Sequence, residues 1–260
     1  MRLIAVDIGN SSIKIAVDSC DMTDEWQTQL MLNAEAPLSQ ELSNLPFEND
    51  SFFWAVSSVH QPKESKLSDW IKKHRPSDHF HLIQENEVTL PSNIQSRNSL
   101  GRDRLISAWM ALKLNQTQGP VIIVDAGTAV TIDWVDPEGT FQGGVIFPGV
   151  ESNFKRLNAF TDALPDLGMH SDNLPLSPIF DSVIGKSTAD AIQKGVYHSQ
   201  WYAIREIVDQ MSKLSSDPAS TFATGGGLNN MTEKLNQDWR YIPDLVLRGA
   251  RAIGRKLNCV

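Results

Sequence analysis

Two short segments place an acid, a glycine and small polar side chains directly after a run of β-branched residues. The first is Asp7-Ile8-Gly9-Asn10-Ser11-Ser12, and the second is Asp125-Ala126-Gly127-Thr128. A carboxylate at the end of a strand suits Mg²⁺, which prefers oxygen ligands. A glycine lets the backbone approach a ligand closely and tolerates a positive φ. We therefore expect two phosphate-binding turns, the first with Asp7 near Mg²⁺ and Lys14 as a nearby cation.

The two segments lie within longer stretches of similar sequence. Residues 3–18 and 121–136 align without a gap, and six of their sixteen pairs are identical, namely Ile4, Val6, Asp7, Gly9, Val17 and Asp18 with the residues 118 positions later. Each stretch predicts a β-hairpin whose turn carries the acid and the glycine. A duplicated fold follows directly, although two unrelated hairpins with a turn glycine would share part of this pattern.

The remaining pattern predicts an α/β fold made of two duplicated halves, residues 1–117 and 118–260. We expect strands at 52–59, 79–83, 141–147 and 221–224, and helices at 63–74, 103–114, 151–160, 188–212 and 245–257, with a further helix from about Asn230. Such a mixture gives mixed central sheets flanked by helices. We expect the final helix to pack back on the first half, and residues 165–178, rich in Pro, Asp and Ser, predict a surface loop or lid.

A third group of polar residues, Gly101-Arg102-Asp103-Arg104, precedes the helix predicted at 103–114. Asp103 stands where an N-cap belongs, and capping alone would explain it. The helix N-terminus is expected to lower its pKa, yet a weak base within hydrogen-bond reach of a hydroxyl still suffices for phosphoryl transfer. Arg104 would then bind an anionic group. Thr224-Gly225-Gly226-Gly227 would accommodate a nucleotide's sugar or base, or serve only as a helix-entry loop.

Composition excludes several other classes of function. The 260 residues carry a formal net charge of −8, which does not suit a general nucleic-acid binder. The two cysteines, Cys20 and Cys259, make no disulfide framework and indicate a reducing compartment. No window is apolar enough to span a membrane, and the N-terminal apolar run is too short for a signal peptide. We expect a cytoplasmic protein without nucleic-acid or membrane partners.

Seven motifs in a fixed order resemble the type III pantothenate kinases, within the superfamily of acetate and sugar kinases, heat-shock ATPases and actin. They are DIGNSSIK at 7–14, LGRDR at 100–104, DAGTAVTID at 125–133, GGVIFPG at 143–149, IGKSTADAIQKG at 184–195, TGGG at 224–227 and PDLVLRGA at 243–250. The resemblance implies two ribonuclease-H-like domains with a cleft between them. It also implies an ATP-dependent kinase that phosphorylates pantothenate to 4′-phosphopantothenate, the first step of coenzyme A biosynthesis.

The resemblance further implies a role for each matching residue. ATP would be bound by Asp7, Ile8, Gly9, Asn10, Ser11, Ser12, Ile13, Lys14 and Thr128. Pantothenate would be bound by Gly101, Arg102, Asp103, Arg104 and Thr188, with Asp103 as the catalytic proton acceptor. Asp125 would ligate a monovalent cation, K⁺ or NH₄⁺, and Asp7 would hold the Mg²⁺ that accompanies ATP. The family is a homodimer with its substrate pocket near the dimer interface.

One departure from the family pattern concerns the substrate site. The family usually has a tyrosine six residues before the leucine of LGxDR and a proline three residues later, where this chain has Ile94 and Arg97. Isoleucine donates no hydrogen bond, so one substrate contact is in doubt. A related kinase for another small hydroxyl compound and a nucleotide-binding regulatory accessory factor therefore stay as alternatives.

Overall fold

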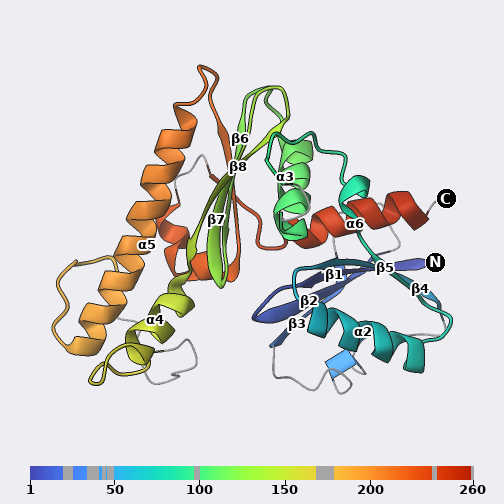
Figure 1. Cartoon of the computed structure of the whole chain (residues 1–260), viewed down its shortest axis with the longest axis horizontal. Coiled ribbons are helices and arrows are strands. Elements are labelled where there is room, and N and C mark those ends of the chain that lie inside the picture. The colour runs from blue at the N-terminus through green and yellow to red at the C-terminus, as the bar shows by residue number, and fades with distance from the viewer. Residues whose placement is uncertain are drawn as a thin grey trace. The chain divides into compact units, whose positions relative to one another are not determined.

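The computed structural model describes residues 1–19, 26–33, 41–42, 45, 50–96, 100–167, 179–235 and 239–258. The chain divides into two compact units (Figure 1). The first comprises Met1–Leu114 with Asp244–Val260, and the second Asn115–Pro243. Both cysteines, Arg97 and residues 168–178 lie outside the described residues. The predicted division at residues 117 and 118 and the predicted lid stay predictions.

The first unit is built on a five-stranded sheet in the order β3-β2-β1-β4-β5. Its strands are β1 (Arg2–Ile8), β2 (Ser12–Asp18), β3 (Trp26–Asn33), β4 (Phe52–Ser58) and β5 (His79–Leu82). β1 runs antiparallel to β2 and parallel to β4, so the sheet is mixed. All seven side chains of β4 are buried, as expected of a strand covered on both faces.

Helices cover both faces of this sheet. They are α2 (Gln61–His74), α3 (Arg102–Leu114) and α6 (Leu245–Asn258), and a short 3₁₀ helix, η1 (Glu85–Glu87), follows β5. Leu67 and Ile71 of α2 pack with Ile4 and Val6 of β1. On the other face α6 packs against β1 and β4 and beside α3. A Cβ on Gly254 would lie 2.6 Å from the Ala55 Cβ, so this glycine lets α6 lie close to the sheet.

The second unit repeats the same topology. Its strands are β6 (Val121–Ala126), β7 (Ala129–Val135), β8 (Phe141–Pro148), β9 (Ser220–Thr224) and β10 (Trp239–Tyr241), in the order β10-β9-β6-β7-β8. Read from the opposite edge, this order is β8-β7-β6-β9-β10. If the strands of each unit are numbered one to five along the chain, both sheets have the order 3-2-1-4-5. Again the first strand runs antiparallel to the second and parallel to the fourth. The duplication expected from the two hairpins is confirmed in strand order and direction.

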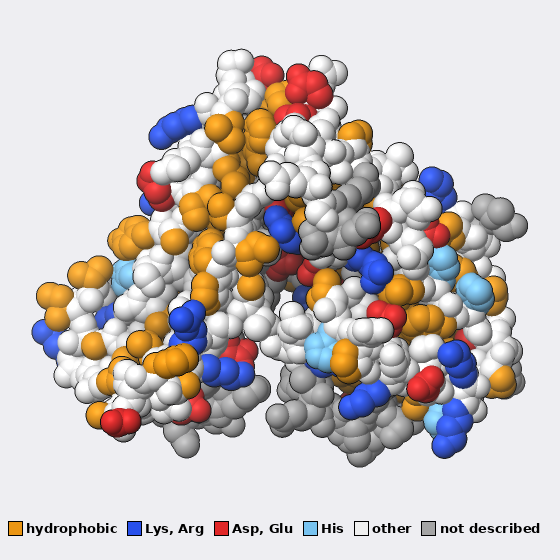
Figure 2. Space-filling view, in the orientation of Figure 1, with side chains coloured by type: hydrophobic (Ala, Val, Ile, Leu, Met, Phe, Trp, Pro, Cys, Tyr) orange, Lys and Arg blue, Asp and Glu red, His pale blue; other side chains and the backbone are white. Residues whose placement is uncertain are grey.

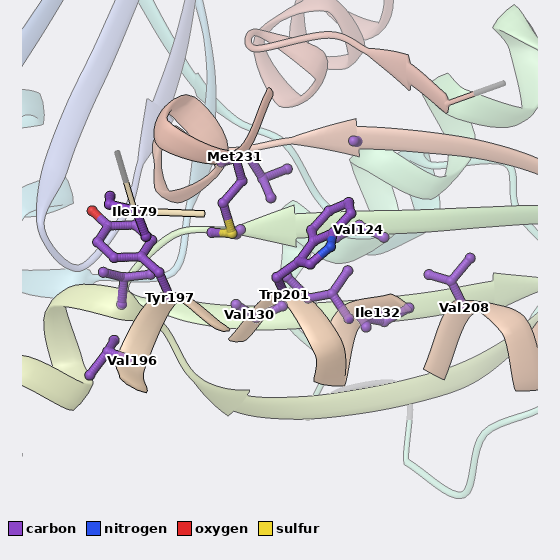
Figure 3. Close-up of a cluster of buried hydrophobic side chains, with 14 of the residues drawn as sticks. Val124, Val130, Ile132, Ile179, Val196, Tyr197, Trp201, Val208 and Met231 are labelled. Carbon is purple, nitrogen blue, oxygen red and sulfur yellow. The ribbon is translucent and has the colours of Figure 1, made fainter. Parts of the chain in front are cut away.

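The core of the second unit lies between this sheet and its helices. The helices are α4 (Val150–Ala159) and α5 (Thr188–Ser212), with a 3₁₀ helix, η3 (Gly226–Lys234). Figure 3 shows Tyr197 and Trp201 of α5 packed over Val124 and Val130 of the sheet, and Met231 of η3 joins the same buried cluster. The helix expected from Asn230 was wrong in type and start, because the chain forms a 3₁₀ helix directly after Gly225.

Charge is dispersed over the face of the molecule in view. Figure 2 shows Lys and Arg side chains scattered singly among Asp and Glu, while apolar side chains gather over part of the second unit. Exposed apolar residues of that unit include Ile146 of the edge strand β8 and Tyr202 of α5. Among the helices the structure describes, none is long and apolar enough to cross a membrane.

Asp244 fixes the start of α6 to the first sheet. Its Oδ2 accepts a hydrogen bond from Trp26 Nε1 of β3 at 2.6 Å, and its Oδ1 accepts one from Arg248 Nε at 2.9 Å. Burial alone would raise the pKa of Asp244. The hydrogen bonds from Trp26 and Arg248 and the charge of Arg248 outweigh burial, so the pKa lies below its usual value of 3.8. The ionised carboxylate therefore stabilises the first unit.

We predict that Asp244→Ala lowers the free energy of unfolding by about 1–3 kcal/mol at pH 7, because two hydrogen bonds to a charged group are lost. The folded-state pKa is depressed, so the stabilisation is present above the unfolded-state pKa and is lost as the pH falls through the folded-state value. Urea unfolding at pH 7 and pH 3 measures the difference. Asp69→Ala, at an exposed position of α2 in the same unit, is the control. Equal loss at both pH values would contradict the ionic origin.

Candidate active site

The first polar turn joins β1 to β2. Asp7 is the penultimate residue of β1, and the turn is closed by Gly9 N–H donating to Ser12 O at 3.0 Å. Asp7 is half-buried, while Asn10 and Ser11 are exposed. Asp7 stands opposite the half-buried Lys14 on β2 and beside Ser57 on β4. One carboxylate and one ammonium group therefore lie at the same end of the sheet.

The fold does not require glycine at position 9. The expected positive φ at Gly9 was wrong, since the described glycines with positive φ are Gly139, Gly143 and Gly225. A Cβ on Gly9 would meet only Ser12 O, at 3.5 Å, which is ordinary contact. The side chains of Ile8 and Ile13 are buried in the core, so these two residues offer a ligand only their backbone. The open space over Gly9 is what a phosphate group resting on the backbone needs.

Asp103 lies at the start of α3, one residue inside the helix. The predicted N-cap role is wrong, because α3 begins at Arg102 and the Gly101 carbonyl accepts from Arg104 N at 3.1 Å and Leu105 N at 3.3 Å. The Asp103 Oδ1 accepts instead from the Arg104 N–H at 2.8 Å. A Cβ on Gly101 would lie 2.4 Å from that oxygen. Glycine at 101 thus lets the carboxylate fold over the helix start.

The pKa of Asp103 is raised, not lowered as expected from its helix position. Burial is the main cause, and it outweighs the hydrogen bond from Arg104 N–H and the charge of Arg104, both of which lower the pKa. A carboxylate with a raised pKa is a stronger base. The environment of Asp103 therefore favours a role in proton transfer over a capping role.

The first unit brings the Asp7 turn and the Asp103 segment to neighbouring strand ends. Arg102 Nη1 donates to the Ser58 carbonyl at the end of β4, at 3.4 Å. The next residue, Val59, donates its N–H to Ile8 O at 3.1 Å, and its Cγ1 would lie 3.7 Å from a Cβ on Gly101. Both predicted motifs of this unit therefore meet at the carboxyl ends of β1 and β4, where ligands bind in open α/β sheets.

The second polar turn joins β6 to β7 in the same manner. Asp125 is again the penultimate residue of its strand, and Gly127 N–H donates to Ala129 O at 2.9 Å. The Thr128 carbonyl accepts from Gly149 N at 3.0 Å and Ser152 Oγ at 2.5 Å. The start of α4 thereby fixes the position of Thr128. A Cβ on Gly149 would come within 2.1 Å of Gly127 O, so only glycine fits against this turn.

Asp125 also lies against the glycine loop that follows β9. Gly225 has a φ of +92°, and a Cβ there would lie 2.3 Å from Ala126 O and 2.6 Å from Asp125 Oδ1. The Tyr241 hydroxyl donates its one hydrogen to Asn229 Oδ1 at 3.0 Å or to Gly225 O at 3.4 Å. Burial, with a smaller contribution from the Asp125 charge, raises the pKa of Tyr241. The loop at 224–227 is thus held against the Asp125 turn.

Thr188 lines a cavity of about 550 Å³ in the second unit. It is the first residue of α5, whose N-cap Ser187 accepts from Asp190 N at 3.2 Å. The cavity is bounded by α5 residues Ala191, Ile192, Gly195, Val196 and Ser199 and by Asn153, Leu157 and Leu164. Its size falls within the usual range for small-molecule sites. A mostly apolar wall with a few hydroxyl and amide groups suits a small polar metabolite with an aliphatic part.

Sequence comparisons decide the family. The family model described as type III pantothenate kinase matches residues 3–210. The chain belongs to the type III pantothenate kinase family. A curated type III pantothenate kinase from Agathobacter rectalis is 31% identical, with 98% of each chain covered. That of Alkalilimnicola ehrlichii is 30% identical, with 97% of this chain and 98% of the relative covered.

Solved structures agree in fold. A protein described as a conserved putative Baf family transcriptional activator from Campylobacter jejuni matches with a TM-score of 0.58 at 21% identity, covering 100% of both chains. A putative 2-dehydro-3-deoxygalactonokinase from Sinorhizobium meliloti also gives 0.58, at 14% identity over 98% of this chain and 96% of the other. Together with the repeated strand order, these matches support the duplicated ribonuclease-H-like fold.

The residues at the first turn fit the Mg²⁺ that the kinase family implies. Ser57, beside Asp7, is fully buried, and its hydroxyl has no partner among the residues the structure describes. Mg²⁺ keeps several waters and takes one or two carboxylates together with substrate phosphates. One carboxylate with an unsatisfied hydroxyl beside it suits such a hydrated ion. Across the described ranges, no group of three or more His, Cys, Asp or Glu gathers as a metal site.

Two oxygen atoms of the second turn lie close to Gly225. The Ala126 carbonyl and the Asp125 carboxylate both border the space that a Cβ on Gly225 would fill. Carbonyl and carboxylate oxygens are of the kind that K⁺ accepts as ligands. The Gly225 backbone packs so closely against both oxygens that a side chain there would displace them.

Three further residues support the turns, and sequence reasoning missed two of them, Lys63 and Tyr241. Lys63 of α2 donates to the carbonyls of Gly9 and Asn10, Gly149 packs on the second turn, and Tyr241 holds the Gly225 loop. Gly149 lay in the quoted GGVIFPG motif, and its glycine was a usable signal. Lys63 and Tyr241 carried none, because their partners lie far away in sequence. Ile94, in place of the family tyrosine, is half-buried.

Proposed function

We propose that this chain transfers the γ-phosphoryl group of ATP to the primary hydroxyl of pantothenate, giving 4′-phosphopantothenate for coenzyme A biosynthesis. Membership of the type III pantothenate kinase family carries this proposal. The raised pKa and strand-end position of Asp103 support it from the structure. The protein acts as a cytoplasmic homodimer that uses Mg²⁺ and K⁺ or NH₄⁺.

In the proposed reaction Asp103 accepts the proton of the pantothenate hydroxyl. The hydroxyl oxygen attacks the γ-phosphorus, the bond to the β–γ bridging oxygen breaks, and ADP leaves. Phosphoryl transfer depends mainly on positioning and charge neutralisation, so one partly buried carboxylate suffices as base. Mg²⁺ and the monovalent cation supply charge that neutralises the phosphates. Arg104 binds an anionic group of the substrate or the transferring phosphoryl.

The other residues position the two substrates. The open backbone between Gly9 and Ser12, with Lys14, binds phosphate oxygens of ATP, and Thr128 makes a further ATP contact. Gly101 and Arg102 shape the pantothenate site near Asp103. Thr188 contacts pantothenate through the cavity on α5. Asp7 holds the hydrated Mg²⁺, and Asp125 ligates the monovalent cation.

An ADP-release assay with and without pantothenate tests the proposal. We expect ADP release to depend on pantothenate and to rise severalfold when K⁺ or NH₄⁺ replaces Na⁺. Asp125→Asn should remove the preference for K⁺ over Na⁺, because the carboxylate charge that holds the cation is lost. Failure to turn over pantothenate in K⁺ or NH₄⁺ would overturn the proposed substrate. A screen of other small hydroxyl compounds would then identify the acceptor.

A further inference from the structure

Lys63 makes a long-range contact with the first polar turn. It lies in the first turn of α2, where its own N–H donates to Nδ1 of the N-cap His60 at 3.3 Å. Its Nζ donates to the carbonyl of Gly9 at 3.0 Å and also to the carbonyl of Asn10. One ammonium group therefore holds two consecutive carbonyls of the turn between β1 and β2.

The ammonium group of Lys63 binds these two carbonyl oxygens. In the part of the chain that the structure describes, it contacts these two carbonyl oxygens and forms no ion pair with a carboxylate. Burial lowers the pKa of Lys63 below its usual value of 10.5. A cation that is partly desolvated and bound only to neutral oxygens keeps its charge available to a nearby anion.

Peptide geometry links this contact to the opposite side of the turn. In a trans peptide the C=O and the N–H of the next residue point in opposite directions. Holding the Gly9 carbonyl on Lys63 thus directs the Asn10 N–H away from Lys63. Holding the Asn10 carbonyl directs the Ser11 N–H the same way. Two consecutive N–H groups pointing to one side form an anion-binding concavity.

We propose that Lys63 is a positioning residue that pre-organises the turn at Gly9 to Ser11 for the phosphates of ATP. The inference rests on the proposed ATP-binding role of this turn and deepens it. Lys63 acts through the backbone it holds and through its positive charge, without touching the reacting atoms. Without it, the two peptides lose their fixed orientation and must be ordered by the nucleotide itself.

Lys63→Met tests the proposal, with Lys66→Met at an exposed position of the same helix as the matched control. We expect Lys63→Met to raise the Kd for ADP and the KM for ATP about tenfold or more, the effect of losing charge-assisted hydrogen bonds. The Kd for adenosine, the KM for pantothenate and most of kcat should stay unchanged. Lys63→Arg, which keeps the charge and the donors, should restore most of the ADP affinity.

Calorimetric titration of the full chain with ADP and with adenosine separates the outcomes. Equal ADP affinity in Lys63→Met and the unchanged chain overturns the inference, as does equal weakening of ADP and adenosine binding. If Lys63→Met fails to fold, Lys63→Gln carries the same comparison, because its amide retains one donor pair. The inference and the proposed function can fail separately. If ADP binding depends on Lys63 but the chain does not phosphorylate pantothenate, the inference is supported and the proposed function is refuted.

Discussion

We expect Asp103→Asn to lower kcat by about 10²–10⁴-fold, the range for loss of a general base, which is the role proposed for Asp103. Asparagine keeps the size of the side chain and an oxygen that accepts from Arg104 N–H, so the start of α3 is preserved. The KM values for ATP and pantothenate should change little. Steady-state kinetics with each substrate varied in turn measure kcat and the two KM values separately. Asp69→Asn, exposed on α2, controls for a general effect of losing one negative charge.

Stability should move in the opposite direction from activity. Burial raises the pKa of Asp103 above 3.8, so the ionised carboxylate destabilises the folded state at neutral pH. Replacing it with a neutral amide should leave the melting temperature unchanged or higher. A variant that is inactive yet no less stable would exclude unfolding as the cause. A clear drop in melting temperature would instead favour a structural role for Asp103.

The fall of kcat/KM at low pH, the acid limb of its pH profile, should reflect the protonation of Asp103. In its proposed role Asp103 must be ionised to accept a proton, so kcat/KM should fall as the pH drops through its raised pKa, above 3.8. The charge of Arg104 lowers that pKa, and Arg104→Met should therefore shift the limb to higher pH. The limb should disappear from the residual activity of Asp103→Asn. A limb unchanged in both variants would assign it to another group.

Local features of the fold could be predicted because they depend on residues that are close together in the sequence. Each hairpin, with its penultimate aspartate, follows from two β-branched runs and a polar turn, and both appear as expected. The helix at Thr188–Ser212 follows from apolar periodicity. Strand order is not local and was not predicted, but the two sheets have the same order, as the duplication predicted from the hairpins requires. Family resemblance then supplied the chemistry that pattern alone left open.

The errors arise where the tertiary environment decides. The helix position of Asp103 predicts a lowered pKa, but burial beneath surrounding structure reverses the direction. The contact between Lys63 and Asn10 spans 53 residues, and nothing in the local sequence marks it. Gly9 was assigned a positive φ that belongs instead to Gly225, since only the folded loop shows which glycine is conformationally required. Burial and long-range contact are properties of the packed chain.

Gly225→Ala should destabilise the second unit by about 2–4 kcal/mol, from a non-glycine residue at positive φ and from overpacking. The new Cβ would lie 2.3 Å from the Ala126 carbonyl, whose backbone cannot move without disturbing β6. Gly226→Ala is the matched control, because the nearest atom to its Cβ would be Asn229 Nδ2 at 4.0 Å. Urea unfolding of both variants measures the difference, and equal stabilities would contradict the steric argument.

The same substitution should impair cation use. A Cβ at Gly225 would lie 2.6 Å from Asp125 Oδ1, so the carboxylate must shift or the loop must move away. Activity remaining in Gly225→Ala should therefore show a reduced preference for K⁺ over Na⁺. Gly226→Ala should keep the preference of the unchanged chain. An intact preference in Gly225→Ala would place the cation away from this loop.

Gly9→Ala, unlike Gly225→Ala, should impair ATP binding without lowering stability. Its Cβ would make only ordinary contact with Ser12 O, and alanine reduces the entropy of the unfolded chain, so stability should stay equal or rise slightly. The added methyl group occupies the space where a phosphate approaches the backbone, so the KM for ATP should rise. Gly225 would then be retained to hold Asp125 in place, and Gly9 to leave room for the nucleotide. The two glycines would thus be distinguished by experiment. Gly225→Ala would lower the free energy of unfolding, whereas Gly9→Ala would raise the KM for ATP.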